Sequence, residues 1–282
     1  MKIQIRVATG LMAALFLAIT ACNNGQQAAK TETTETAAAS YKEENITYGA
    51  DSIQLKGFIA YSDSSDYKRP GILVVPEWWG VTDYTRKRAR RLAELGYVAL
   101  VVDMYGEGKT ADNPQDAGTL AEPFYTNLVL TKSRVDAALA KLKTYPQVDT
   151  ANIAAIGYCF GGSVALNVAK LGEDLKGIVV FHGNLAGAAP DAKLLKAKVL
   201  VCHGAVDPFV KPEEVTTFKK QMDSIGANYT FKAYPDAVHA FTNPDATEKG
   251  KKFNIPIAYN QQADSTSWID MQQFFGTIFP AR

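Results

Sequence analysis

The chain has 282 residues, a formal net charge of +1, and hydrophobic residues at 47% of its positions. A near-neutral chain without basic runs is not typical of nucleic-acid-binding proteins, so we expect no nucleic-acid partner. Its three cysteines are not arranged in the CxxC or Cys/His spacings of zinc sites. We therefore expect neither a metal ion nor an organic cofactor.

The N-terminal segment differs in composition from the rest of the chain. Residues 1–21 resemble an export signal, because Lys2 and Arg6 precede an apolar stretch too short to span a bilayer comfortably. The stretch ends in Ile19-Thr20-Ala21-Cys22, which looks like the lipobox of bacterial lipoproteins. That likeness implies cleavage before Cys22 and acylation of this cysteine. The alternative is an ordinary signal peptide in which Cys22 has no role.

Cleavage would remove two basic residues and no acidic one, which changes the net charge from +1 to −1. Residues 22–42 would then be the acylated cysteine and a flexible tether, since this polar stretch cannot offset the entropy cost of ordering. Residues 43–282 are long enough for one domain with a sizeable core. We expect a monomer anchored by lipid to a bacterial membrane. Asn23 provides no acidic retention signal, which favours the outer membrane.

Apolar, β-branched runs alternate with helical patterns, which predicts an α/β fold with a mainly parallel central sheet and helices on both faces. Ile46–Ala50 and Ile53–Tyr61 should open it as an antiparallel pair. Further strands are expected at Gly71–Val75, Tyr97–Val102, Ile153–Ile156, Gly177–Phe181, Lys198–Cys202 and Tyr229–Tyr234, and helices at Tyr84–Leu95, Thr131–Thr144, Ser163–Leu171, Glu213–Ile225 and Ser265–Phe279. Residues 104–124, rich in Gly, Asp, Asn and Pro, are predicted to be a long loop that walls the site.

Gly157-Tyr158-Cys159-Phe160-Gly161-Gly162 lies between a predicted strand and a predicted helix. It has the form of a nucleophile elbow with cysteine in place of serine. The glycines allow close backbone approach, and the positive end of the following helix favours the thiolate of Cys159. The N–H of Phe160 can point at a developing oxyanion. A buried structural cysteine in a glycine-rich turn is the alternative.

A general base and an acid follow in the chain order that this fold uses. Asp207 and His239 each come shortly after a predicted strand, at the sheet edge where α/β sites form. His239 would accept the proton of Cys159, and Asp207 would fix the imidazole tautomer. Asp236 is a weaker acid candidate, because it is too close in sequence to His239.

The other two histidines also follow predicted strands. We interpret His203, together with Cys202, as a core or supporting group, whereas His182 is a candidate for the pocket wall. Asp103 is expected to shape the loop after its strand.

These motifs resemble the dienelactone hydrolase family of the α/β-hydrolase superfamily over about residues 50–280. The likeness rests on residues 75–80 (VPEWWG), residues 103–106 (DMYG), the cysteine elbow, His203-Gly204 with Asp207, and His239-Ala240-Phe241. It implies a carboxylic ester or lactone hydrolase, of the carboxymethylenebutenolidase kind, that works through a cysteine acyl-enzyme.

The resemblance also implies roles for neighbouring residues. Glu77 would interact with the resting thiol and help its activation, and Trp78 would supply the second oxyanion N–H. A carboxylate beside a thiol opposes thiolate formation and so protects the free enzyme from oxidants. An aromatic substrate pocket is expected from Trp79, Tyr105, Tyr125, Phe209 and Phe241.

Two departures concern the substrate. Family members that cleave dienelactone bind its carboxylate with an Arg after the DMYG turn and a Ser after the catalytic histidine. Residues 113–125 contain no Arg, and Ala240 follows His239. The resemblance therefore does not identify an acidic dienelactone as the substrate, and the natural substrate stays open.

Two other functions stay open from the sequence. The chain could be a surface-anchored binding protein on a hydrolase scaffold, since fold does not fix function. A disulfide between Cys159 and Cys202 would instead make the site redox-controlled or inactive.

Overall fold

The computed structural model describes residues 41–50, 52–63 and 67–280. The predicted export signal, Cys22 and nearly all of the tether lie outside these residues. The strands are β1 (Tyr41–Ala50), β2 (Ile53–Ser62), β3 (Arg69–Val75), β4 (Val98–Val101), β5 (Val148–Tyr158), β6 (Gly177–Phe181), β7 (Lys198–Gly204) and β8 (Tyr229–Tyr234). The helices are α1 (Asp83–Glu94), α2 (Pro114–Thr126), α3 (Leu128–Lys143), α4 (Phe160–Lys170), α5 (Pro212–Ser224), α6 (Ala246–Phe253) and α7 (Gln261–Ile278).

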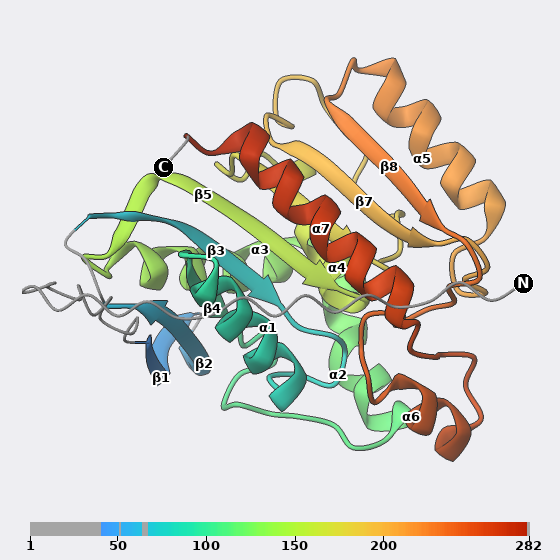
Figure 1. The fold of residues 1–282 in the computed structure, drawn as a ribbon, viewed down its shortest axis with the longest axis horizontal. Coiled ribbons are helices and arrows are strands. Elements are labelled where there is room, and N and C mark those ends of the chain that lie inside the picture. Colours follow the sequence, from blue (N-terminus) through green and yellow to red (C-terminus); the bar gives the residue numbers. More distant parts are fainter. Residues whose placement is uncertain (1–40, 51, 64–66, 281–282) are drawn as a thin grey trace, which may run out of the picture. The chain divides into compact units, whose positions relative to one another are not determined.

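Within the described residues the strands form one eight-stranded sheet in the order β1-β2-β4-β3-β5-β6-β7-β8 (Figure 1). β2 pairs antiparallel with both β1 and β4, and the strands from β3 to β8 run parallel. The predicted antiparallel opening and mainly parallel sheet are therefore confirmed. β1 begins at Tyr41, two residues before the expected start of the domain.

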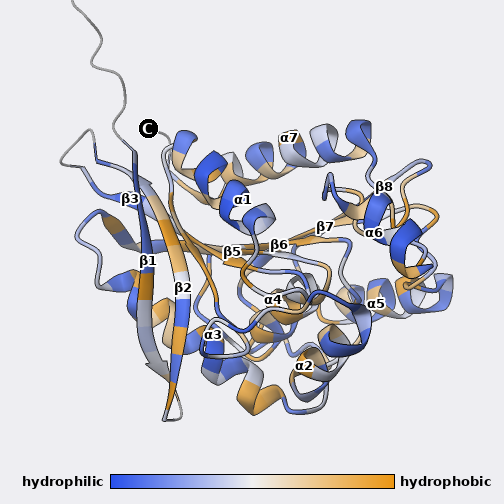
Figure 2. Cartoon of the chain, turned by 90° about the horizontal axis from the view of Figure 1, so that it is seen from below, coloured by the Kyte–Doolittle hydropathy of each residue, from blue (hydrophilic) through white to orange (hydrophobic). Residues whose placement is uncertain are grey.

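Helices cover both faces of this sheet, as the sequence predicts. α1 and α7 lie on one face, and α2, α3, α4 and α5 lie on the other (Figure 2). The side chains of β3 alternate between the two resulting cores: Ile72 and Val74 pack on the α1–α7 side, whereas Leu73 and Val75 pack on the α3–α4 side. This alternation explains why the strand is apolar at consecutive positions, because each face of a doubly covered sheet is buried.

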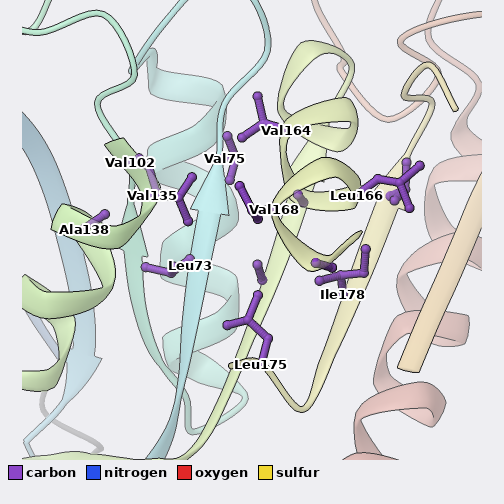
Figure 3. Packing of buried hydrophobic residues seen from close by; sticks show 14 of the residues in the cluster. Leu73, Val75, Val102, Val135, Ala138, Val164, Leu166, Val168, Leu175 and Ile178 are labelled. Atoms are coloured by element: carbon purple, nitrogen blue, oxygen red, sulfur yellow. The ribbon is translucent and has the colours of Figure 1, made fainter. Parts of the chain in front are cut away.

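The larger core lies between the sheet and α3 and α4 (Figure 3). Val135 and Ala138 of α3 face Leu73 of β3, and Val164 and Val168 of α4 lie above Val75 and β5. The small and β-branched residues of α4 let the helix approach the sheet closely. This packing fixes the helix that begins at the candidate nucleophile.

The strand order places a crevice at the carboxyl end of the sheet. β3 has β4 on one side and β5 on the other, so the connections leaving β3 and β5 run to opposite faces. Ligands bind at such a switch point in open α/β sheets. Glu77 follows β3 and Cys159 follows β5, which puts both residues at this position.

Two helices differ from the sequence prediction. Residues 104–124 are not one long loop, because α2 occupies Pro114–Thr126. The residues interpreted as loop-forming are its start signals: Pro114 opens the helix, and the Asn113 side chain accepts a hydrogen bond from the Asp116 N–H at 3.0 Å. α6 was not predicted.

The first residue of α4 also differs, because the helix begins at Phe160 and not at Ser163.

No helix in residues 41–50, 52–63 and 67–280 combines the length and apolar character needed to cross a bilayer.

Candidate active site

Cys159 sits at a sharp turn between β5 and α4, with a positive φ of 53° and a ψ of −117°. Its flanking glycines are required by space. A Cβ on Gly157 would lie 1.9 Å from the Gly161 carbonyl oxygen, and a Cβ on Gly161 would lie 2.2 Å from the Val75 carbonyl oxygen. The turn therefore holds the Cys159 side chain above the sheet, at the N-terminal end of α4.

The structure brings the three predicted catalytic side chains together. His239 Nε2 lies 3.0 Å from Cys159 Sγ, and His239 Nδ1 lies 2.8 Å from Asp207 Oδ2. Asp207 and His239 follow β7 and β8, so three strand ends supply the set. Asp207 is held by its own turn, because its Oδ1 accepts the Phe209 N–H at 2.8 Å. This line of nucleophile, base and acid is the geometry of a catalytic triad.

His239 is buried, and its surroundings favour the imidazolium. Burial alone lowers the pKa of His239, but the negative charge of Cys159 and the hydrogen bonds with Asp207 and Cys159 outweigh it and raise that pKa to about 10. The protonated form of His239 is thus favoured at neutral pH.

Trp78 and Phe160, which line one cavity together with Cys159, carry the backbone N–H groups that we expect to bind an oxyanion. The N–H groups of Trp78 and Phe160 have no acceptor within the part of the chain that the structure describes. The Glu77–Gly80 turn, closed by the Gly80 N–H to the Glu77 carbonyl at 3.0 Å, positions the first of them. Tyr105 supports both, because its hydroxyl donates to the Trp78 carbonyl at 2.8 Å and its ring stacks on Phe160.

Glu77 is 2% exposed and lines the same cavity as Cys159. Its Oε2 accepts a hydrogen bond from Asn243 Nδ2 at 2.7 Å. Burial raises the pKa of Glu77, opposed by the charge of Lys249 and the Asn243 hydrogen bond. The expected contact of Glu77 with the resting thiol is not the arrangement seen here, since Cys159 Sγ faces His239.

A cavity of about 150 Å³ lies above Cys159. Its lining is mostly apolar and aromatic, and consists of Glu77, Trp78, Trp79, Tyr125, Cys159, Phe160, Asn184, Phe209, His239, Ala240, Ile255 and Ile257. The predicted pocket residues Trp79, Tyr125 and Phe209 are among these. Phe209 also packs edge-on against the His239 ring.

Two residues predicted for the pocket do not line it. Tyr105 lies behind Trp78 and Phe160, as described above, and Phe241 is fully buried against Tyr234 and His182. Their aromatic type does not reveal which way they face. His182 is not in the cavity wall either, although its ring packs against that of His239.

The possible disulfide is ruled out in this structure, because Cys159 and Cys202 are both free. Cys202 lies on β7 in the core on the α1–α7 side, where the Tyr234 hydroxyl donates to its sulfur at 3.4 Å. It is therefore a core residue, as predicted. His203 is also buried, and packs against Phe231.

Asp103 has the structural role that the sequence suggested. Its carboxylate accepts the backbone N–H groups of Tyr105, Gly106 and Gly108 at 2.9 to 3.1 Å and of Lys56 at 2.8 Å. The turn that carries Tyr105 is thus fixed by one buried carboxylate.

Sequence reasoning missed Asn184, Ile255, Ile257 and Asn243. Asn243 follows His239 by four positions, a signal that could have been used. Ile257 forms a β-bridge with His239 after the unpredicted helix α6, which no local pattern indicates. In the described residues no group of three or more His, Cys, Asp or Glu side chains is arranged to hold a metal ion.

The fold is that of an α/β-hydrolase, and the Cys159, His239 and Asp207 side chains are joined by hydrogen bonds at the carboxyl edge of its sheet. The model of the dienelactone hydrolase family matches residues 55–279. The chain belongs to this family, as the sequence motifs indicated, and is in class a carboxylic ester hydrolase.

Individual relatives agree with this assignment. Protein usf of Aquifex pyrophilus is 29% identical over 228 residues, which cover 76% of this chain and 96% of that protein. A protein of Methylorubrum extorquens, provisionally named carboxymethylenebutenolidase, is 32% identical over 61% of this chain and 63% of its own length. Among solved structures, the dienelactone hydrolase-like promiscuous phosphotriesterase P91 from metagenomic libraries is 33% identical, with a TM-score of 0.81 over 86% of this chain and 100% of that one.

Proposed function

We propose that the protein hydrolyses a small, uncharged carboxylic ester or lactone through an acyl-enzyme on Cys159. The observation that carries this proposal is the 3.0 Å contact between His239 Nε2 and Cys159 Sγ. Beside it are the Trp78 and Phe160 N–H groups, which have no acceptor among the described residues. A nucleophile, a base and oxyanion donors are the minimum set for acyl transfer.

In this mechanism the Cys159 thiolate attacks the carbonyl carbon, and the carbonyl π electrons move to the oxygen. The N–H groups of Trp78 and Phe160 stabilise that oxyanion. The tetrahedral intermediate collapses to a thioester, and the leaving alkoxide takes a proton from the His239 imidazolium. His239 then accepts a proton from water, and the resulting hydroxide attacks the thioester. Collapse of this second tetrahedral intermediate releases the acid and leaves the Cys159 thiolate beside the His239 imidazolium.

The cavity supports an uncharged substrate. Among its described lining residues the charged groups are Glu77 and His239, and neither a Lys nor an Arg is present. A substrate carboxylate would lie near the buried Glu77 without a permanent cation opposite it, which is costly. Trp79, Tyr125 and Phe209 instead favour an apolar or aromatic acyl or alcohol group.

The test is hydrolysis of p-nitrophenyl acetate by the full-length, fully reduced protein. We expect saturable turnover that is lost in Cys159→Ala and retained in Cys202→Ala, which removes a buried thiol of no catalytic role. Rapid quenching should trap one acetyl group on Cys159 by mass spectrometry. Dihydrocoumarin should be cleaved faster than cis-dienelactone. A folded, reduced protein that neither turns over these compounds nor becomes acylated would overturn the proposal and favour a binding role.

We also propose that the protein is exported and anchored through acylated Cys22, most simply in the outer membrane. The lipobox-like Ile19-Thr20-Ala21-Cys22 supports this proposal. Metabolic labelling with an alkyne fatty acid should mark the wild-type protein and not Cys22→Ser, and membrane fractionation should assign the membrane. Unlabelled wild-type protein would contradict acylation.

We propose a monomeric state, which light scattering on the detergent-solubilised protein can check.

A further inference from the structure

His182 has no role in the proposed chemistry, yet it contacts both the Cys159 turn and the segment that carries His239. It directly follows β6 in a left-handed backbone conformation, with a φ of 41°, and is 1% exposed. Its Nδ1 lies 3.1 Å from the backbone nitrogen of Cys159, and its Nε2 lies 2.7 Å from the hydroxyl of Thr242. One imidazole thus joins the nucleophile turn to the segment that carries His239.

The hydrogen-bond partners determine where the proton of His182 sits. A backbone N–H can only donate, so Nδ1 must present its lone pair to Cys159. The ring proton is then on Nε2 and is donated to Thr242. The Cys159 N–H is shared between His182 Nδ1 and the Phe181 carbonyl, which lies at 2.9 Å. A proton on Nδ1 would point at the Cys159 N–H, so two hydrogen-bond donors would face each other.

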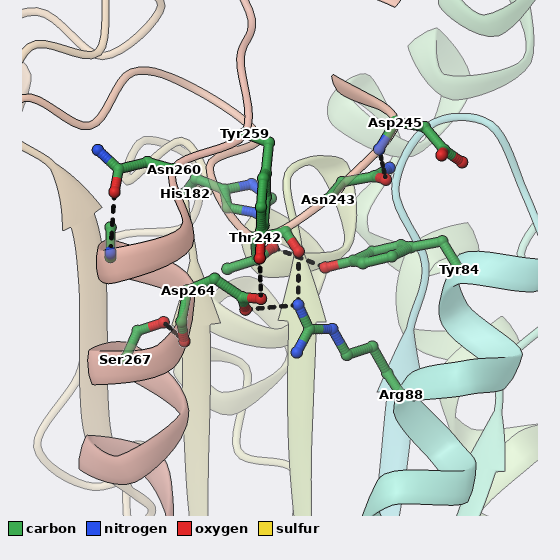
Figure 4. Close-up of polar contacts among 11 residues, drawn as sticks. Tyr84, Arg88, His182, Thr242, Asn243, Asp245, Tyr259, Asn260, Asp264 and Ser267 are labelled. Carbon is green, nitrogen blue, oxygen red and sulfur yellow. Dashed lines mark hydrogen bonds and ion pairs between the residues drawn. The ribbon is translucent and has the colours of Figure 1, made fainter. Parts of the chain in front are cut away.

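Thr242 is a firmly held acceptor (Figure 4). Its hydroxyl lies 2.6 Å from the hydroxyl of Tyr84, and its carbonyl accepts a hydrogen bond from Arg88 Nη2. Arg88 is in turn paired with Asp264 at 2.6 Å. Because Tyr84 and Arg88 belong to α1 and Asp264 to α7, the helices on one face of the sheet hold Thr242 in place.

The charge of the neighbours requires a neutral His182. Its ring centroid lies 5.4 Å from that of His239, which carries a positive charge at the start of the proposed mechanism. Burial, followed by the positive charges of His239 and Arg88, lowers the pKa of His182 well below its ordinary value. A second imidazolium here would oppose the one that stabilises the Cys159 thiolate.

We propose that His182, as the neutral Nε2–H tautomer fixed by Thr242, is a positioning residue that holds the Cys159 turn in register with His239. This role rests on the proposed function, because it concerns the geometry between that nucleophile and that base. His182 itself touches no reacting atom. A small displacement of the reacting groups would be sufficient to slow catalysis by about a hundredfold.

Two substitutions separate the two hydrogen bonds of His182. In His182→Asn the amide oxygen can take the place of Nδ1 and accept from Cys159, whereas in His182→Gln the amide nitrogen takes the place of Nε2 and can reach only Thr242. We expect kcat near the wild-type value for Asn and about ten- to a hundredfold lower for Gln, with little change in KM. The rate of Cys159 alkylation by iodoacetamide, measured without substrate, should follow the same order.

Thr242 gives a second test if the His182 variants fold poorly. Thr242→Val removes the acceptor of Nε2–H, which drives the proton to Nδ1 against the Cys159 N–H, so kcat and alkylation should both fall. Thr242→Ser keeps the hydroxyl and should restore both rates. Thr85→Val is the matched control, because Thr85 is equally buried and its hydroxyl donates to the Thr82 carbonyl within the first turn of α1.

Equal rates for His182→Asn and His182→Gln, or a folded Thr242→Val with wild-type kcat and alkylation, would overturn the inference. Alkylation also separates this outcome from a failure of the proposed function. If esters are not cleaved but alkylation responds as expected, the positioning role stands without the esterase. If esters are cleaved and neither rate responds, the esterase stands without the positioning role.

Discussion

His239 Nε2 lies 3.0 Å from Cys159 Sγ, although the two residues are 80 positions apart in the chain. The contact spans the sheet from the end of β5 to the segment after β8. The contact forms only if the parallel strands between these two segments are in register. It therefore depends on the arrangement of the carboxyl edge of the sheet from β5 to β8.

Asp207→Asn should lower kcat on p-nitrophenyl acetate by about a thousand- to ten-thousandfold. The Asn amide can keep the contact with His239 Nδ1 but favours the wrong tautomer, which leaves Nε2 protonated and unable to act as base. Asp236→Asn is the control, since Asp236 is exposed and follows the same strand as His239. A loss in Asp236→Asn comparable to that in Asp207→Asn would contradict the assignment of the acid.

The His239 ion pair should make stability depend on pH. With its pKa raised to about 10, His239 stabilises the folded state fully below its ordinary pKa of 6.5. This stabilisation is lost as the pH rises through about 10, because the folded state then releases the proton that it had retained. The difference in free energy of unfolding between wild type and His239→Gln should therefore shrink from pH 6 to pH 10 in urea titrations.

His203 provides the opposite sign as a control. Burial lowers the pKa of His203, so wild type should lose stability relative to His203→Gln as the pH falls below 6.5. If both variants gave the same pH slope, the raised pKa of His239 would not explain the result.

Gly161→Ala should destroy the nucleophile turn. The added Cβ would meet the carbonyl oxygens of Val75 and Pro76 at 2.2 and 2.5 Å, and backbone atoms cannot move aside cheaply. We expect loss of activity and a decrease of about 3 kcal/mol in the free energy of unfolding. Gly118→Ala in α2 is the matched control, with no atom within 4 Å of the new Cβ, and should gain about 0.5 kcal/mol. Calorimetry of both variants measures the change in stability, and an activity assay of both measures the loss of turnover.

Glu77→Gln should stabilise the folded protein and lower its activity. The raised pKa of Glu77 means that its charged form is disfavoured by burial, so stability falls as the pH rises above the ordinary value of 4.5. Gln keeps an acceptor for Asn243 without the charge. The melting temperature at pH 7.5 should therefore rise relative to wild type, whereas at pH 4 the two should agree.

The same substitution tests the activating role of Glu77. If the carboxylate suppresses thiolate in the free enzyme, hydrogen peroxide should inactivate Glu77→Gln faster than wild type, while kcat/KM falls. Unchanged oxidation and unchanged kcat/KM would remove Glu77 from the mechanism.

The buried pair of Arg88 and Asp264 should be necessary for folding stability. The two side chains are 4% and 11% exposed, so Asp264→Asn leaves a buried cation without its counter-charge and should cost about 3 kcal/mol or more. The exposed pair Lys251–Glu248 is the control, and Lys251→Ala should change the free energy of unfolding by less than about 0.5 kcal/mol. Equal effects would show that burial does not decide the strength of these pairs.

The amino-acid sequence by itself determined the parts that depend on local rules. Strand–turn–helix patterning around Cys159, the apolar runs of β3, β6 and β7, and the order of nucleophile, acid and base predict the fold class, which the structure confirms. The positions of the glycines in the elbow also predict the sharp turn, because such a turn needs residues without a Cβ.

Only the tertiary structure decided how side chains are oriented and which distant segments meet. Tyr105 and Phe241 look like pocket aromatics in sequence, but packing turns them away from the cavity, and Ile255 and Ile257, in the segment after α6, line it instead. The link from Cys159 through His182 and Thr242 to Arg88 joins four segments with no shared local pattern. Such contacts arise from the burial of polar groups that must find partners, a condition set by the whole fold.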